Sequence, residues 1–155
     1  MKTKNIIISL LLIMIVFITG CSSNKIKVAA TLDSFNTVTT NKGFTVTNNT
    51  EAYKDVNYIT GSMKAIYEDI EIEMVQYSDS ETAGLAQDSH IESFNLLRST
   101  GAHEVKDKGK NYYSYALVSN GRYMISSRID NTLIFCKAML DDKELVEKIM
   151  DELDY

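Results

Sequence analysis

The chain has 155 residues, of which 45% are hydrophobic and 24% are charged, with two cysteines and no proline. This composition excludes a collagen-like chain, a disulfide-stabilised scaffold and a disordered acidic tail, and the length predicts one domain. The net charge is −5. Because contacts between basic side chains and phosphates dominate nucleic-acid affinity, we expect no nucleic acid among the partners.

The first twenty residues have the composition of an export signal. Lys2 and Lys4 precede an apolar run from Ile6 to Ile18 that only Ser9 interrupts. A membrane-spanning helix needs about 20 apolar residues, so this run is too short for a permanent span. A charged start, a short apolar core and small residues before a cleavage site are the parts of a secretory signal. The sequence therefore predicts that residues 1–20 are a signal peptide.

The residues at the end of this run, Ile18-Thr19-Gly20-Cys21, resemble the lipobox of bacterial lipoproteins. In that family the cysteine receives a diacylglycerol thioether and becomes the new N-terminus. The resemblance implies that Cys21 is the lipid attachment site and that acyl chains such as palmitate hold the protein on the outer face of the cell membrane. Two acyl chains give stable anchoring, whereas one gives marginal binding. The alternative is an ordinary signal peptide or an uncleaved anchor.

The chain beyond the predicted signal peptide is more acidic than the whole. Residues 1–20 contain two lysines and no acidic residue, so the remainder has 14 basic and 21 acidic side chains and a net charge of −7. Residues 21–30 are predicted to be a short tether, which spans at most about 35 Å when extended. Residues 31–155 are then a single domain. The lipid at Cys21 is sufficient to hold this domain at the membrane, and no other contact with the bilayer is required.

The first half of this domain is predicted to contain a helix followed by strands. A helix over Leu32–Lys42 has Thr31 as its N-cap and Gly43 beyond its C-terminus. Three strands follow, over residues 44–46, 62–67 and 70–77, the last two joined at Glu68-Asp69. In the third strand Glu71 and Glu73 alternate with apolar residues, which indicates a solvated strand face rather than a metal or acid–base pair.

The longest predicted helix covers residues 78–100. Ser78-Asp79-Ser80-Glu81 fits a capping box, and Gly101 closes the helix. His90 lies on its apolar stripe, which favours a core or boundary role over catalysis. Asp88 and Ser89 do not share a helix face with His90, so these three residue types indicate no hydrolase triad. His103 is predicted to lie in a loop.

The last third of the chain is predicted to be a three-strand meander and a closing helix. Asn120-Gly121 between alternating residues is a strong hairpin signal, and Asp130-Asn131 turns the chain again. These two-residue loops fix the strand register. They place small residues on one face, assigned to the helix-covered core: Ser114, Ala116, Val118, Ile125, Ser127, Ile134, Cys136 and Ala138. Asp141 is predicted to cap the final helix.

The opposite face of the meander carries aromatic and polar side chains. Tyr113, Tyr115, Arg128 and Phe135 lie on it, and an exposed apolar patch of this kind usually marks a partner or ligand site. We hypothesise that these four residues bind a peptide, a glycan strand or a protein. The alternative is that a helix or a loop such as residues 47–58 covers the face.

The sequence contains no motif that indicates an enzyme. Cys136 lies in the middle of a strand on the small-residue face, which favours a buried, inert thiol over a nucleophile. No zinc-ligand spacing, Gly-rich phosphate loop or nucleophile elbow occurs in the sequence, so we expect neither a metal nor a cofactor. The sequence favours a non-enzymatic binding or accessory module, with a cell-surface hydrolase or thiol enzyme, or a structural envelope component, as alternatives.

These elements predict an α+β fold: two layers, with a mainly antiparallel sheet of five to seven strands and three helices in the order helix, strands, helix, strand meander, helix. The turn at Asp130-Asn131-Thr132-Leu133 and the closing helix that ends in Tyr155 resemble small uncharacterised lipoproteins of low-GC Gram-positive bacteria. That resemblance implies an extracytoplasmic location and no particular site.

Overall fold

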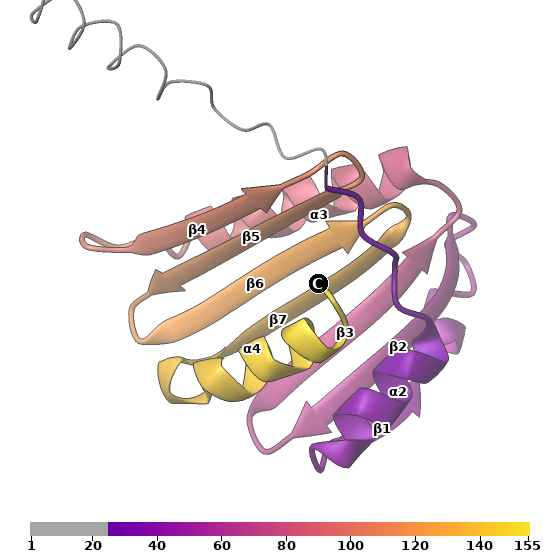
Figure 1. Cartoon of the computed structure of the whole chain (residues 1–155), viewed down its shortest axis with the longest axis horizontal. Helices are drawn as coiled ribbons and strands as arrows, with labels where there is room; N and C mark the ends of the chain where they lie inside the picture. The colour runs from indigo at the N-terminus through magenta and orange to yellow at the C-terminus, as the bar shows by residue number, and fades with distance from the viewer. Residues whose placement is uncertain (1–24) are drawn as a thin grey trace, which may run out of the picture.

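The computed structural model describes residues 25–155, so the predicted signal peptide and Cys21 lie outside the described residues. The described chain folds around one antiparallel seven-stranded sheet with the order β1-β2-β3-β7-β6-β5-β4 (Figure 1). The strands are β1 (Thr45–Asn48), β2 (Ile59–Tyr67), β3 (Ile70–Tyr77), β4 (His103–Lys108), β5 (Tyr112–Ser119), β6 (Arg122–Ile129) and β7 (Thr132–Met139). The helices are α2 (Leu32–Asn41), α3 (Ser80–Asn95) and α4 (Lys143–Glu152), with short 3-10 turns at Thr50–Tyr53 and Leu140–Asp142. Within residues 25–155, no helix is long and apolar enough to cross a membrane.

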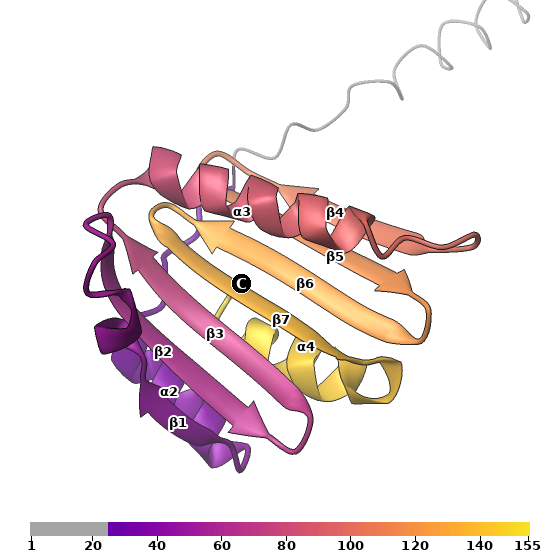
Figure 2. The same ribbon diagram turned by 180° about the vertical axis from the view of Figure 1, so that it is seen from behind.

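The predicted α+β class, strand number and element order are confirmed, but the prediction of two layers is corrected. Helices α2 and α4 lie on one face of the sheet, and α3 lies on the other (Figures 1 and 2). The central strands explain the third layer, because β6 has buried residues at five consecutive positions, Tyr123 to Ser127. A strand buried on both faces requires cover on both.

The predicted meander register is confirmed. Ala116 pairs with Ile125, and Ile125 pairs with Cys136 in the next strand. Both hairpin turns use the left-handed backbone region, with φ of 52° at Asn120, 69° at Gly121 and 48° at Asp130. Asparagine, aspartate and glycine tolerate this region best, so the turn residues set the register and thereby decide which side chains face each helix.

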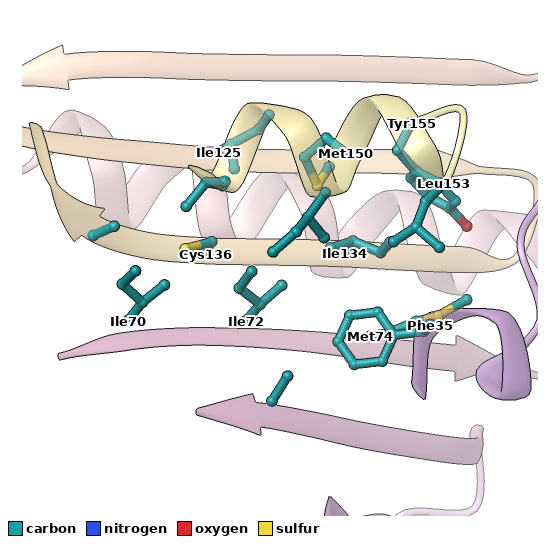
Figure 3. Close-up of a cluster of buried hydrophobic side chains, with 14 of the residues drawn as sticks. Phe35, Ile70, Ile72, Met74, Ile125, Ile134, Cys136, Met150, Leu153 and Tyr155 are labelled. Carbon is teal, nitrogen blue, oxygen red and sulfur yellow. The ribbon is translucent and has the colours of Figure 1, made fainter. Parts of the chain in front are cut away.

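The main core lies between the sheet and helices α2 and α4 (Figure 3). Helix α2 starts where predicted, because the Thr31 hydroxyl accepts a hydrogen bond from the Ser34 amide at 3.1 Å. Its Phe35 side chain is fully buried against the sheet. Helix α4 contributes Val146, Ile149 and Met150 to the same core. The capping role predicted for Asp141 is wrong, because a 3-10 turn precedes α4 and Asp142 occupies the N-cap position without a side-chain bond.

Helix α3 starts two residues later and ends five residues earlier than the predicted range 78–100, and its N-cap is Asp79, inside the predicted capping box. At its start, the Asp79 carboxylate accepts a 2.8 Å hydrogen bond from the Thr82 amide. At its end, the chain leaves the helix to contact the end of β5. The Ser119 hydroxyl donates to the Leu97 carbonyl at 2.8 Å and accepts from the Ser99 amide at 2.9 Å. Bonds to the sheet thus replace the last helical turn.

Strand β4 was not predicted, and His103, expected in a loop, is its first residue. Its residues His103–Lys108 are mostly exposed and charged, so they lack the apolar alternation that signals a strand. Pairing with β5 along its whole length, from His103 opposite Val118 to Lys108 opposite Tyr113, defines it instead. Charged side chains are typical of edge strands, which they protect from unwanted pairing.

Candidate functional site

Helix α3 covers the candidate binding face predicted from the sequence (Figure 2). Tyr115 is 1% exposed, and Tyr113, Arg128 and Phe135 are partly buried. The side-chain amide of Gln87 in α3 donates to the main-chain carbonyl of Tyr113 at 2.7 Å. The sequence left open whether this face is an exposed aromatic surface or is covered by another element. In the structure it is covered by α3.

The covered face is closed by its own hydrogen bonds as well as by packing. Phe94 of α3 packs with Tyr115 in one apolar cluster. The Tyr115 hydroxyl accepts a hydrogen bond from Arg98 at 2.9 Å and lies 3.1 Å from the side-chain oxygen of Asn95, to which it donates. This tyrosine is thus fully engaged within the chain, which assigns it to the scaffold.

His90 occupies the boundary position that the sequence favoured. Its ring lies edge-on to that of Phe135, with ring centroids 4.0 Å apart. Burial lowers the pKa of His90, and the nearby charge of Lys137 lowers it further. Asp88 and Ser89 are exposed on the other side of the helix. The lowered pKa favours the neutral, packed imidazole, and among the described residues no carboxylate forms a hydrogen bond to the ring.

The opposite face of the sheet is open where α4 does not reach. Helix α4 lies along β7, and no helix of the described chain covers β4 and β5 on that side (Figure 1). The resulting groove between α4 and β4 encloses about 270 Å³. Its floor consists of small apolar side chains from neighbouring strands, namely Val105, Ala116, Val118 and Ile125. The helix wall consists of Lys143, Glu147, Met150 and Asp151, with His103, Asp107, Ser114, Tyr123 and Tyr155 also lining the groove.

This groove shows that the predicted small-residue face is only partly covered. Ile134, Cys136 and Ala138 of β7 are buried in the main core, as the sequence indicated. Ala116 and Val118 of β5 are only partly buried, because α4 is ten residues long and lies over the neighbouring strands. The part of the face that α4 leaves free becomes the floor of the groove.

Acidic side chains dominate the charges around the groove. Asp107, Glu147 and Asp151 oppose a single lysine, Lys143. The Lys143 ammonium lies 3.5 Å from the Glu147 carboxylate, which leaves Asp107 and Asp151 without an ion pair among the described residues. Such a site combines an apolar floor with a negative rim. It can hold an apolar group that carries a positive charge.

Tyr123 adds a neutral hydroxyl to the floor of the groove. Burial raises its pKa, and the adjacent carboxylate of Glu147 raises it further. The Tyr123 hydroxyl donates to Glu147 at 3.4 Å, a long bond that a ligand can compete for. The phenol therefore stays protonated and serves as a hydrogen-bond donor rather than as a base.

Cys136 is buried, as predicted. Its side chain is 0% exposed, and burial raises its thiol pKa to about 12. A nucleophilic thiol needs exposure and a lowered pKa, and Cys136 has neither. In residues 25–155, no group of three or more His, Cys, Asp or Glu side chains is arranged to hold a metal ion.

The interpretation of Glu71 and Glu73 as one solvated strand face is correct only for Glu71. Glu71 is exposed and paired with Lys64 at 2.7 Å, whereas Glu73 is 4% exposed. One carboxylate oxygen of Glu73 accepts hydrogen bonds from Asn49, Tyr53 and Ser62 at 2.9, 2.9 and 2.7 Å. The cover comes from the segment between β1 and β2, part of the loop over residues 47–58 that the sequence indicated as one possible cover for the Phe135 face, although not for Glu73. The acidic residues of the groove were also missed, because β4 and α4 meet only in the folded chain.

The start of the described chain is fixed to the domain. The Lys25 carbonyl accepts a hydrogen bond from the Lys110 amide at 3.1 Å. The Asn111 side chain accepts from the Lys27 amide at 3.0 Å and donates to the Lys27 carbonyl at 2.9 Å. Residues 25–30, expected to be part of a tether, therefore lie along the domain, and residues 21–24 of the expected tether lie outside the described residues.

Comparison with known proteins identified no relative: no family model, curated protein or solved structure matches the chain.

Proposed function

We propose that the protein is an exported, lipid-anchored binding module, and that the groove between α4 and β4 receives a peptide segment with a basic side chain beside apolar ones. The observation that carries the proposal is the groove itself, with its apolar floor and its excess of carboxylates. Its volume of about 270 Å³ suits a few side chains rather than a large cofactor. No catalytic group is needed for this role.

The chemistry of the rim selects the ligand. Asp107 and Asp151 have no ion pair among the described residues, and Glu147 shares Lys143. A basic side chain placed between them is attracted by at least two carboxylates, whereas an acidic one is repelled. Val105 and Val118 on the floor offer apolar contact to its neighbours. Arginine or lysine next to leucine or valine fits both parts.

A binding experiment tests the groove. The full chain is placed in nanodiscs of zwitterionic lipid. It is titrated against a labelled five-residue peptide with a central arginine between leucines, and against a matched peptide with a central glutamate. We expect only the arginine peptide to bind. Changing Glu147→Gln and Asp151→Asn together should weaken its binding about fivefold, as two partly exposed charges contribute roughly 0.5 kcal/mol each.

The matched control removes two charges that do not line the groove. Asp141 and Glu144 are exposed near the start of α4, so Asp141→Asn with Glu144→Gln changes the net charge equally. This control variant should bind the arginine peptide as the parent does. Equal binding of both peptides, or equal loss in both double variants, would show that the groove is not the site.

The anchor is tested separately, at Cys21. The support for it is the sequence at the export junction, Ile18-Thr19-Gly20-Cys21. Cells that express the full chain are fed labelled palmitate and fractionated. We expect label on the parent protein in the membrane fraction and none on a Cys21→Ala variant. An unlabelled parent, or a Cys21→Ala variant that matures and stays in the membrane, would refute the anchor.

A further inference from the structure

We infer that the end of the domain formed by residues 25–28 and the β4–β5 turn lies against the bilayer surface. Ile26 and Val28 then sit in the lipid interface, and Lys108 and Lys110 lie next to lipid phosphates. This inference rests on the proposed anchor at Cys21, and adds to it which part of the domain the membrane contacts. The partner is the lipid surface itself.

The described chain starts beside the β4–β5 turn. Residues 25–27 bind the β4–β5 turn through the Lys110 amide and both polar atoms of the Asn111 side chain. From there the segment crosses the ends of the central strands toward α2 (Figure 1). The four residues from Cys21 to Asn24 span at most about 14 Å. A lipid at Cys21 therefore keeps this end of the sheet close to the membrane.

Two apolar side chains of this segment are exposed to solvent. Ile26 is 60% exposed and Val28 is 82% exposed, whereas Lys27 between them is 8% exposed. The Lys27 ammonium turns inward, 5.0 Å from the centre of the Tyr112 ring and 3.8 Å from the Asp154 carboxylate. The segment thus buries Lys27 and leaves Lys25, Ile26 and Val28 exposed, so two of its exposed side chains are apolar. In water the exposed Ile26 and Val28 side chains bury no apolar surface. Beside a bilayer they would lie in the apolar part of the lipid interface.

The adjacent β4–β5 turn carries two exposed basic side chains. Lys108 and Lys110 are exposed, and neither forms an ion pair within the described chain. They belong to a chain that is acidic overall, so the free positive charges on this turn are a local feature. Exposed lysines next to a membrane are attracted to anionic lipid over roughly one Debye length, about 8–10 Å. The short reach from Cys21 keeps them within that range.

Single tryptophans test the inference directly, because the chain contains none. Val28→Trp reports on the proposed contact. Leu96→Trp is the matched control, because Leu96 is 83% exposed against 82% for Val28. Leu96 lies beside the β5–β6 turn, where the Asn120 side chain bonds to Leu97. That turn is at the other end of β5, about 25 Å away. The full-length lipidated variants are reconstituted into vesicles that contain brominated phosphatidylcholine.

We expect brominated lipid to quench Val28→Trp and to leave Leu96→Trp unchanged. Adding anionic phosphatidylglycerol should increase quenching at position 28. Lys108→Gln with Lys110→Gln should abolish that increase, whereas Lys54→Gln with Lys148→Gln, at exposed positions elsewhere, should not. Equal quenching at both positions, or none at position 28 in protein that sediments with the vesicles, would overturn the inference. A chain without palmitate that does not sediment would instead refute the anchor.

Discussion

The side chain of Gln87 donates a 2.7 Å hydrogen bond to the main-chain carbonyl of Tyr113, which fastens helix α3 to the strand beneath it. A second bond from the same amide nitrogen, 3.0 Å long, reaches the Ser126 carbonyl in the neighbouring strand. Gln87 is only 1% exposed. One polar side chain on an otherwise apolar helix face thus fixes how α3 lies across β5 and β6.

Replacing Gln87 by leucine should destabilise the domain while keeping most of the packed volume. Both hydrogen bonds are lost and leucine offers the two carbonyls no donor, so we expect the free energy of unfolding to fall by about 2 kcal/mol. Urea denaturation of the full chain measures this. Glu92→Leu, at an exposed position of the same helix, should change it by no more than about 0.5 kcal/mol. If both variants unfold alike, the amide does not hold the helix.

Gly109 leaves room for the start of the chain to dock. A Cβ at this position would lie 2.1 Å from the Tyr112 ring and 2.6 Å from the Lys25 carbonyl oxygen. Gly109→Ala should therefore push residues 25–27 off the β4–β5 turn and cost about 1–3 kcal/mol of stability. Hydrogen exchange at the Lys110 amide, which donates to Lys25, should become faster.

The matched control for this change is Gly84→Ala in α3. The nearest atom to an added Cβ there is Arg128 Nε at 4.0 Å, an ordinary contact. Alanine also favours the helix by up to about 1 kcal/mol relative to glycine. Gly84→Ala should leave the Lys110 amide unchanged and keep or raise stability. An unchanged Lys110 exchange rate in Gly109→Ala would contradict the docking contact, on which the membrane-facing end depends.

The buried thiol of Cys136 should make stability fall in alkaline solution. Burial, then the charges of Asp142 and Glu71, raise its pKa from 9.0 to about 12. Below pH 9 the thiol is neutral in both states, so its contribution is fully present. Above pH 9 only the unfolded chain ionises, and stability declines by up to about 1.4 kcal/mol per pH unit until the pKa near 12. Urea unfolding between pH 8 and 10.5 should show a shallower decline for Cys136→Ala.

Thiol labelling of the same residue gives a direct check. In a Cys21→Ala background, Cys136 is the only cysteine in the chain. The native protein should resist a disulfide reagent, and the protein in concentrated urea should react at once. Rapid labelling of the native protein would mean that the thiol is accessible and would reopen the thiol-enzyme alternative.

The parts of the fold that the sequence predicted are those set by local signals. The Asn120-Gly121 turn placed Ala116 opposite Ile125, and the pairing in the structure is the same. Thr31 likewise marked the start of α2. Turn and cap residues act within a few positions of the chain, so their effect can be predicted without knowing the tertiary structure.

The candidate site could not be predicted in the same way, because it depends on contacts between distant segments. The sequence showed that Tyr115 shares a sheet face with Phe135, but not that α3 returns to cover both (Figure 2). The groove arises because α4 leaves part of β5 uncovered, and its edge strand β4 has no apolar alternation. How far α4 extends over the sheet cannot be seen in the sequence as a periodic pattern. The same holds for β4, which is a strand only because it pairs with β5.

Glu71 and Glu73 lie two residues apart in β3, and replacing each one tests how much its carboxylate contributes to the stability of the fold. Glu73 is buried and accepts three hydrogen bonds on one oxygen, so Glu73→Ala leaves three donors unpaired and should cost about 3 kcal/mol or more. Glu73→Gln retains an acceptor and should cost less. Glu71→Ala removes only the exposed pair with Lys64 and should cost about 0.5 kcal/mol. Urea unfolding of the three variants ranks them, and equal losses in Glu71→Ala and Glu73→Ala would show that Asn49, Tyr53 and Ser62 do not need the buried carboxylate.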